Sequence, residues 1–240
     1  MINKTKRLMI SRSVKIPRKT FFWGASPRPG KHNRKDSMAL LTALRDYLKI
    51  GDKEREITRI LVNGLVKVDG KIVKDRRYPV GFMDLITIDQ VGKSFRVLYD
   101  RKGGLVLGEE SKDNSDKKLM KVMDKSTIKG GKIQLSFHDG QIVVSDNKEV
   151  KPGDVALVTI PGKKIQEVMK LQPGNKVFLT GGSHAGNVAT IKKIEIKESS
   201  HKNLIHFEEG YSTITDYAFV VGGAKYSYEI PKIGGVAVYE

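Results

Sequence analysis

The order of apolar and polar residues predicts a helix in the first quarter of the chain. Between residues 36 and 50, apolar side chains such as Leu40 and Leu44 recur at steps of three and four. This spacing places them on one face of an α-helix. Asp36 or Ser37 is expected to cap the start of the helix, because a short polar side chain can accept a hydrogen bond from a free backbone amide.

A second helix and a hairpin are expected to follow. Asp52 is the predicted N-cap of this helix, and Asn63-Gly64 ends it. Apolar residues then recur at every second position, because Val66 and Val68 alternate with lysines. Asp69-Gly70 lies in the middle of this segment and predicts a two-residue hairpin turn, since both turn positions favour positive φ.

Beyond residue 93 the pattern predicts mainly β-structure. Short apolar stretches alternate with turns rich in glycine and proline, which is typical of compact β-barrels or sandwiches. The polar segment 109–118 is expected to be a loop. The expected strands, including one that could pair with the hairpin, lie at residues 84–88, 95–99, 104–107, 133–137, 142–144, 155–160 and 177–179.

The amino-acid composition indicates which kinds of molecule the protein could bind. The 240 residues carry 44 Lys and Arg against 27 Asp and Glu, a formal net charge of +17. Such a surplus indicates a polyanionic partner, either nucleic acid or an anionic membrane. The chain has no cysteine, which excludes disulfide scaffolds, thiolate zinc sites and thiol catalysis. No apolar run approaches the ~18–20 residues of a membrane span, and no secretory leader is expected.

The excess positive charge is concentrated in residues 1–35. This segment holds eleven of the bases and no acid before Asp36. Its prolines and glycines predict an extended arm, disordered when free, and its aromatic residues could stack on unpaired bases while the cations neutralise phosphates. The candidate RNA-binding residues here are Lys4, Lys6, Arg7, Arg12, Lys15, Arg18, Lys19, Trp23, Arg28, Lys31, His32, Arg34 and Lys35.

A second basic set is expected on the helix and hairpin. The i,i+4 spacing of Arg55 and Arg59 places both on one helix face, and the hairpin lysines point away from the valines. A continuous surface for RNA could therefore run from the helix across the hairpin. Its candidate residues are Arg55, Arg59, Lys67, Lys71, Lys74, Arg76 and Arg77.

Residues 52–73 resemble the S-four-type RNA-binding module of ribosomal proteins, tRNA synthetases and pseudouridine synthases. The shared features are the helix leading into Gly64 and the V-K-V-D-G-K hairpin. That family usually has an arginine six residues before the glycine, and here the position is Thr58. Arg59 is adjacent, but its direction differs by about 100° around the helix.

Two further segments are similar to known families. Residues 117–140, with K-G-G-K-I-Q-L and H-D-G, resemble the archaeal and eukaryotic small-subunit ribosomal protein family "S four e", and so do I-P-R-K, S-P-R-P-G-K-H and D-Y-A-F-V-V-G near the two ends. Residues 173–191 resemble a KOW motif, a strand–loop–strand unit that opens an SH3-like barrel. The candidate loop residues are Gly181, Gly182, His184 and Gly186.

The resemblance implies a multidomain, mainly β protein with a small α+β module. The expected parts are an extended basic N-terminal arm (1–35), a helix–helix–hairpin RNA-binding module (36–91), a central β-domain (92–170), an SH3-like KOW barrel (171–222) and a C-terminal tail (223–240). It also implies a cytoplasmic structural constituent of the small ribosomal subunit. Its partners would be ribosomal RNA and neighbouring ribosomal proteins, with no membrane and no small-molecule substrate.

No catalytic or metal site is predicted. The five histidines show none of the spacings expected of a metal site, and no cofactor is expected. Two alternatives remain open at this stage. One is an RNA-modifying enzyme that uses the helix–hairpin module as a guide, and the other is a KOW-containing transcription or translation factor that cycles on and off its target.

Overall fold

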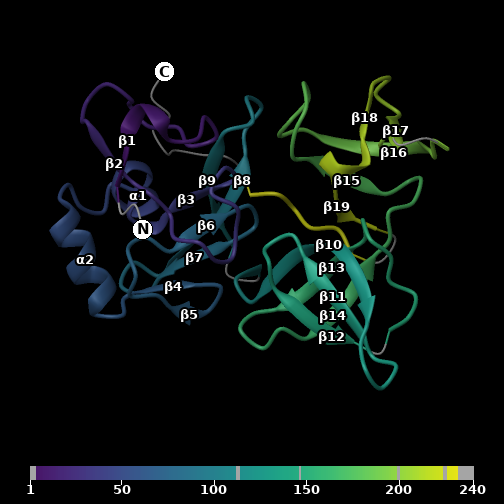
Figure 1. Ribbon diagram of the computed structural model, residues 1–240, viewed down its shortest axis with the longest axis horizontal. Coiled ribbons are helices and arrows are strands. Elements are labelled where there is room, and N and C mark those ends of the chain that lie inside the picture. The colour runs from purple at the N-terminus through teal and green to yellow at the C-terminus, as the bar shows by residue number, and fades with distance from the viewer. Residues whose placement is uncertain (1–3, 112–113, 146, 199–200, 224–225, 232–240) are drawn as a thin grey trace. The chain divides into compact units, whose positions relative to one another are not determined.

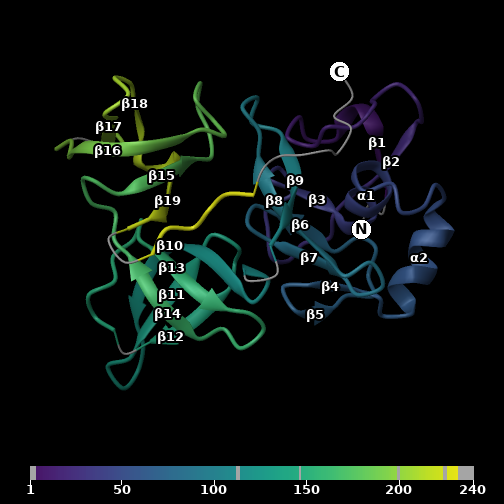
Figure 2. The ribbon, with the colours of Figure 1, turned by 180° about the vertical axis from the view of Figure 1, so that it is seen from behind.

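The computed structural model describes residues 4–111, 114–145, 147–198, 201–223 and 226–231 (Figures 1 and 2). The chain divides into two compact units. The first comprises the described parts of Met1–Tyr99, Gly104–Lys118 and Pro231–Glu240, and the second comprises Asp100–Gly103 and Leu119–Ile230. None of the described helices is both long and apolar enough to cross a lipid bilayer.

An antiparallel five-stranded sheet and one amphipathic helix form the centre of the first unit. The helix is α2 (Glu54–Val62), whose buried Ile57 and Leu61 pack in the same core cluster as Val66 and Val97. In spatial order the strands are β5 (Lys71–Ile72), β4 (Val66–Val68), β7 (Leu85–Ile88), β8 (Lys93–Tyr99) and β9 (Leu105–Glu110). The first unit therefore continues past residue 91 through β8 and β9.

The expected helix over residues 36–50 is shorter than predicted. Ser37–Ala39 forms strand β3, which pairs with β6 (Pro79–Gly81). Only α1 (Leu40–Thr42) and the π-helical segment η2 (Ala43–Tyr47) are helical. Neither Asp36 nor Ser37 caps this helix, because pairing with β6 keeps the backbone extended up to Leu40.

The second helix begins one residue later than expected. Its N-cap is Lys53, so the prediction of Asp52 was wrong. The Glu56 carboxylate accepts hydrogen bonds from the backbone amides of both Asp52 and Lys53, at 3.0 and 3.2 Å, and so satisfies amides that lack a partner within the helix. The predicted end is confirmed, since Gly64 has φ +74°.

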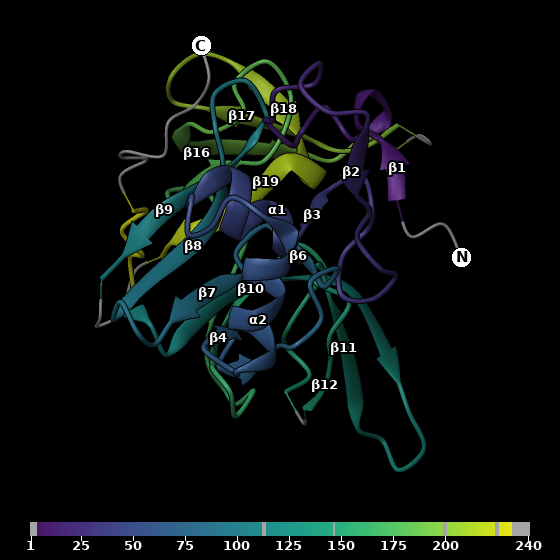
Figure 3. The ribbon, with the colours of Figure 1, turned by 90° about the vertical axis from the view of Figure 1, so that its left-hand side faces the viewer.

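The described part of the N-terminal segment is packed against the rest of the first unit, contrary to the prediction of an arm that is disordered when free. It contains β1 (Lys4–Lys6), the 3-10 turn η1 (Arg7–Met9) and β2 (Trp23–Ala25), which pairs with β1 (Figure 3). Val14 and Ile16 are buried in the core cluster. The Val14 backbone bridges to Leu105, and the Lys15 amide donates to the Tyr47 hydroxyl at 2.7 Å. Apolar side chains between the bases cause this docking, because their burial is favourable.

Two five-stranded sheets make up the second unit. The first has the order β12 (Ile142–Ser145), β11 (Ile133–Phe137), β10 (Lys117–Thr127), β13 (Val155–Thr159) and β14 (Ile165–Met169). The second has the order β18 (Ser212–Ile214), β17 (Leu204–Phe207), β16 (Val188–Glu195), β15 (Lys176–Leu179) and β19 (Ala218–Gly222), with the 3-10 turn η4 (Thr215–Tyr217) before β19.

Most of the expected strands are confirmed, with boundaries that shift by a few residues. The mainly β architecture agrees with the prediction from the short apolar stretches. The loop expected over residues 109–118 is too long, because β9 continues to Glu110 and β10 begins at Lys117.

Candidate nucleic-acid interface

One face of α2 is basic and exposed. Arg55 and Arg59 are both exposed, whereas Ile57 and Leu61 on the opposite side are buried. The i,i+4 spacing therefore places the two guanidinium groups on the solvent side of the helix, as expected. Half-buried Arg76 lies beside the start of the helix, where its Nη1 forms an ion pair with Glu54 at 2.5 Å.

The hairpin presents its lysines on the face opposite its valines. Val66 and Val68 are buried, and Lys71 is exposed. Lys67 is half-buried and pairs with Asp89, with 2.8 Å between Nζ and Oδ2. The turn has the expected geometry, since Asp69 has φ +49° and Gly70 +72°.

Thr58 occupies the position at which the resembling module has arginine. Its hydroxyl donates to the Glu54 carbonyl at 2.8 Å, so the side chain turns back onto the helix. A positive charge is thus replaced by a local hydrogen bond at this position, and the basic character of the face depends on Arg55 and Arg59.

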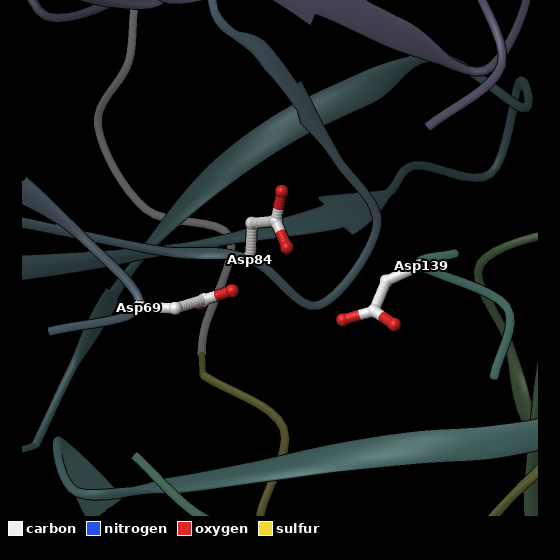
Figure 4. Close-up of side chains that lie close together, drawn as sticks. All are labelled: Asp69, Asp84 and Asp139. Atoms are coloured by element: carbon white, nitrogen blue, oxygen red, sulfur yellow. The ribbon is translucent and has the colours of Figure 1, made fainter. Parts of the chain in front are cut away.

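The turn residue Asp69 also belongs to a buried ionic cluster, which sequence reasoning missed. Figure 4 shows Asp69 close to Asp84, which immediately precedes β7. Lys118 Nζ lies 2.8 Å from the Asp69 carboxylate and 2.5 Å from that of Asp84. Lys31 also contacts both carboxylates, at 2.8 Å from Asp84, and His32 Nε2 lies 2.8 Å from Asp84. We call these five residues the Asp84 cluster.

Opposite charges balance inside the Asp84 cluster. Burial disfavours the charged carboxylate of Asp84, but the ammonium groups of Lys118 and Lys31, together with His32, outweigh this effect and hold its pKa well below the usual value. Both carboxylates also accept backbone hydrogen bonds, Asp69 from Leu85 and Asp84 from Gly81. Two lysines therefore already neutralise the charge that a metal ion would otherwise compensate.

Asp139, also drawn in Figure 4, belongs to the second unit. Its carboxylate accepts hydrogen bonds from the backbone and side chain of Gln141, at 3.1 and 2.7 Å. It therefore helps to form the β11–β12 hairpin turn that Asp139-Gly140 predicts.

Three of the candidate RNA-binding residues are buried and have partners within the protein. Arg7 lies near Asp46, with 3.6 Å between Nη2 and Oδ1, and Arg77 Nε donates to the Ser26 carbonyl at 3.0 Å. His32 packs on Gly81 within the Asp84 cluster, where a Cβ would come within 2.6 Å of the imidazole ring. These side chains attach the N-terminal segment to the first unit.

The other candidate bases are more accessible. Those that are exposed are Lys6, Arg12, Lys19, Arg28, Arg34, Lys35, Arg55, Arg59, Lys71 and Lys74, and those that are half-buried are Lys15, Arg18, Lys31, Lys67 and Arg76. The side chain of Lys4 lies outside the described residues.

Aromatic side chains accompany the bases of the N-terminal segment. Phe21, Phe22 and Trp23 are 70%, 62% and 53% exposed. Phe22 and Trp23 pack edge to face, and the Lys6 ammonium lies 5.6 Å from the Phe22 ring centre. Exposed rings beside a cation can stack on unpaired bases.

The glycines of the loop 181–186 are needed for packing within the second unit. A Cβ on Gly186, which has φ +76°, would lie 2.6 Å from the Asp100 backbone. A Cβ on Gly181 would lie 2.7 Å from the Tyr217 ring. The imidazole of His184 stacks on Tyr211, with 3.9 Å between ring centres. Gly181 and Gly186 therefore allow a close approach between this loop and other parts of the second unit.

The second unit contains a buried lysine that sequence reasoning also missed. Lys121 on β10 donates to the carbonyls of Thr215, Asp216 and Ala218, at 3.1, 2.8 and 2.9 Å. Burial lowers its pKa to about 8, against an opposing effect of Asp216. Its ammonium group joins the sheet that contains β10 to the turn before β19.

Comparison of the chain with known protein families first identifies one of its domains. The S4 domain model matches residues 47–86, which include the end of η2, α2, the hairpin and the first part of β7. The chain is therefore a protein with an S4-type RNA-binding domain, as the helix and hairpin predict.

The particular family follows from two further findings. The model of ribosomal family S4e matches residues 91–165. The chain is 55% identical to small ribosomal subunit protein eS4 of Thermoplasma volcanium over 96% of this chain and 97% of that one, and 40% identical to the protein of the same name from Archaeoglobus fulgidus over 90% and 92%. The chain belongs to ribosomal family S4e.

A solved structure supports this assignment. The crystal structure of 30S ribosomal protein S4e from Thermoplasma acidophilum has a TM-score of 0.72 and 51% identity to this chain, and covers 80% of this chain and 98% of that one. The family is one of ribosomal proteins rather than of enzymes, as the sequence predicts.

Proposed function

We propose that this protein is a non-catalytic structural component of the small ribosomal subunit that binds ribosomal RNA and supports subunit assembly and translation. The observation that carries the proposal is the full-length similarity to proteins named small ribosomal subunit protein eS4, at up to 55% identity. The archaeal sources of these relatives favour an archaeal type of ribosome in the cytoplasm.

The first unit supplies the main RNA-binding surface in this proposal. Arg55 and Arg59 on α2, Lys71 on the hairpin, Lys74 after it and the exposed bases of the N-terminal segment would neutralise phosphates of packed RNA strands. The deep groove of an A-form helix hides its base edges, so recognition here depends mainly on backbone shape. The buried bases Arg7, His32 and Arg77 would act indirectly, by holding the N-terminal segment on the unit.

The second unit would serve as a platform against RNA or neighbouring ribosomal proteins. The sequence predicts a central β-domain over residues 92–170, of which residues 119–170 lie in the second unit. We assign these to the central β-domain and residues 171–222 to a KOW-type SH3-like barrel, with Gly181, Gly182, His184 and Gly186 in the KOW loop. The sheet β18-β17-β16-β15-β19 supports this assignment, because β15 and β16 flank the loop. The N-terminal arm (1–35) and the module (36–91) would act as one RNA-binding body, and residues 223–240 would form the C-terminal tail.

Retention on ribosomal particles tests the proposed function. The tagged full-length protein, expressed in an archaeal host, should co-sediment with small subunits at one copy per particle and remain bound through a high-salt wash. Loss in the wash would indicate a cycling factor, and absence from the particles would refute the proposal. Turnover on ribosomal RNA transcripts would refute the structural role and favour a modifying enzyme.

A further inference from the structure

The N-terminal segment and the strand–helix segment after it enclose a cavity in the first unit. Its volume is about 680 Å³, within the ~300–1,000 Å³ typical of small-molecule sites. Its lining includes Leu8, Met9 and Ile10 of the N-terminal segment and Met38 and Ala39 of β3. Because Met38 belongs to the core cluster, the bottom of the cavity is the outer surface of the core.

Positive charge surrounds this apolar cavity. Arg12, Arg18, Arg34 and Lys35 contribute to the lining, and no Asp or Glu does so. Arg12, Arg34 and Lys35 are exposed, and within the described part of the chain none of their side chains forms an ion pair. The cavity therefore combines apolar side chains with three cations that no described carboxylate neutralises.

Hydrogen bonds hold the walls of the cavity in place. The hydroxyls of Ser11 and Ser13 both donate to the Lys35 carbonyl, at 2.7 and 2.8 Å. The Arg18 guanidinium donates to the carbonyls of Ile10 and Ser11, at 2.8 and 2.9 Å. These bonds lie within the N-terminal segment and fold it back on itself, so the ordering of the wall that it forms is not left to the ligand.

We propose that this cavity receives one unpaired nucleotide extruded from ribosomal RNA. Its base would lie between the apolar walls, and its phosphate would meet Arg12, Arg34 and Lys35. A base that is already unpaired is the least costly to extrude, so the site would select bulged or looped RNA over continuous duplex. This inference rests on the proposed RNA-binding function and specifies how one part of the surface discriminates among RNA structures.

Two RNA hairpins that differ in one nucleotide test the inference. One carries a single unpaired adenosine in its stem, and the other is fully paired. The full-length protein should bind the bulged hairpin about tenfold more tightly, because part of the base is buried against apolar side chains, measured by fluorescence anisotropy at 100 mM salt. With 8-azidoadenosine at the bulge, irradiation should crosslink the RNA to peptides that contain Met9 or Met38.

Two exposed methionines provide matched variants. Met9→Glu places a carboxylate on the cavity wall, whereas Met123→Glu makes the same change on β10, where Met123 is also exposed. Met9→Glu should abolish the preference for the bulged hairpin, and Met123→Glu should retain it. The pair Arg12→Gln with Arg34→Gln should likewise reduce the preference more than Lys129→Gln with Lys132→Gln.

The outcomes separate this inference from the proposed function. Equal affinity of the wild-type protein for both hairpins, or an unchanged preference in Met9→Glu, would overturn the nucleotide site and leave RNA binding intact. A failure to bind either hairpin at low salt would overturn both proposals. Circular dichroism of each variant confirms that the fold is intact before affinities are compared.

Discussion

At the scale of single residues, the Asp84 cluster shows how a buried charge can tie distant parts of a chain together. Asp69 lies in the hairpin turn, and Asp84 immediately precedes β7. Lys31 comes from the N-terminal segment. Lys118 comes from the start of β10. Each carboxylate contacts both lysines, so removal of one leaves positive charge buried with insufficient compensation.

Substitution of Asp84 should therefore destabilise the protein strongly. We expect Asp84→Asn to lower the free energy of unfolding by about 3–5 kcal/mol at pH 7, because buried Lys118 and half-buried Lys31 then share one carboxylate. Urea denaturation followed by circular dichroism measures the loss. As a control, Asp89→Asn removes the partly exposed Lys67–Asp89 pair and should cost less than about 1 kcal/mol. Equal losses in both variants would refute the importance of the cluster.

The stability of the second unit should depend on the protonation of Lys121. Its pKa is about 8 in the folded protein, against the ordinary lysine value of 10.5 that applies to the unfolded chain. Between these values the folded protein releases the proton first while the unfolded chain keeps it, so the stability rises with pH. Below pH 8 both states are protonated, and this pH dependence disappears.

Comparison with Lys121→Met isolates this effect. The free energy of unfolding of the wild-type protein should increase relative to that of the variant by up to about 3 kcal/mol between pH 8 and 10.5. Urea unfolding at pH 7, 8.5 and 10 measures the difference, and other titrating groups cancel because both proteins share them. A difference that stays constant across this range would contradict the assignment.

At this scale, the sequence predicts a residue's conformation correctly where adjacent residues determine it. It does not predict burial or contacts that depend on residues far away in the sequence. Asp69-Gly70 predicted its turn correctly, since the φ values depend on adjacent residues. The burial of Asp69 could not be predicted, because it depends on Lys118, 49 positions later. Arg7, His32 and Arg77 were assigned to RNA by composition, although their side chains are occupied within the fold.

At the scale of elements, the N-terminal segment has a structural role beside its positive charge. Val14 and Ile16 are buried, and Lys31 and His32 complete the Asp84 cluster. An arm that is disordered when free, as the sequence predicts for residues 1–35, could be removed without loss of stability. The structure reverses that expectation, because the deletion exposes part of the core.

Deletion of residues 1–35 should therefore destabilise the first unit by at least about 3 kcal/mol, from the loss of two buried aliphatic side chains. Hydrogen exchange at amides of β8 and β9 would measure this loss. A matched control replaces Lys6, Arg12, Lys19, Arg34 and Lys35 by glutamine, which should weaken RNA binding but leave the exchange unchanged. Unaltered protection in the deletion variant would show that the segment is dispensable for folding.

The elements in which apolar residues recur at a regular spacing were predicted well. The α2 helix, the hairpin and strands such as β11 and β13 follow from spacing and turn residues alone. The predicted helix over 36–50 failed at its start because β3 pairs with β6, about 40 residues away. Tertiary pairing there overrides a local pattern that is compatible with a helix.

At the scale of the whole molecule, the net charge of +17 should govern RNA binding. If the protein covers ~6–10 phosphates, its affinity for ribosomal RNA fragments should fall by ~10³–10⁵ between 50 and 200 mM salt, through release of condensed counterions. Filter binding over a salt series measures the slope. A flat response would argue against phosphate contacts as the main source of affinity.

The bridge between Val14 and Leu105 has a consequence for biosynthesis. Leu105 is made 91 positions after Val14, which takes roughly 5–20 s at ordinary rates of elongation. Throughout that interval the cationic N-terminal segment of the nascent chain lacks the strand with which Val14 will pair. Folding of the first unit must therefore compete with early binding of the N-terminal segment to nearby polyanions. The rate of translation thus affects how the protein folds and binds its partners.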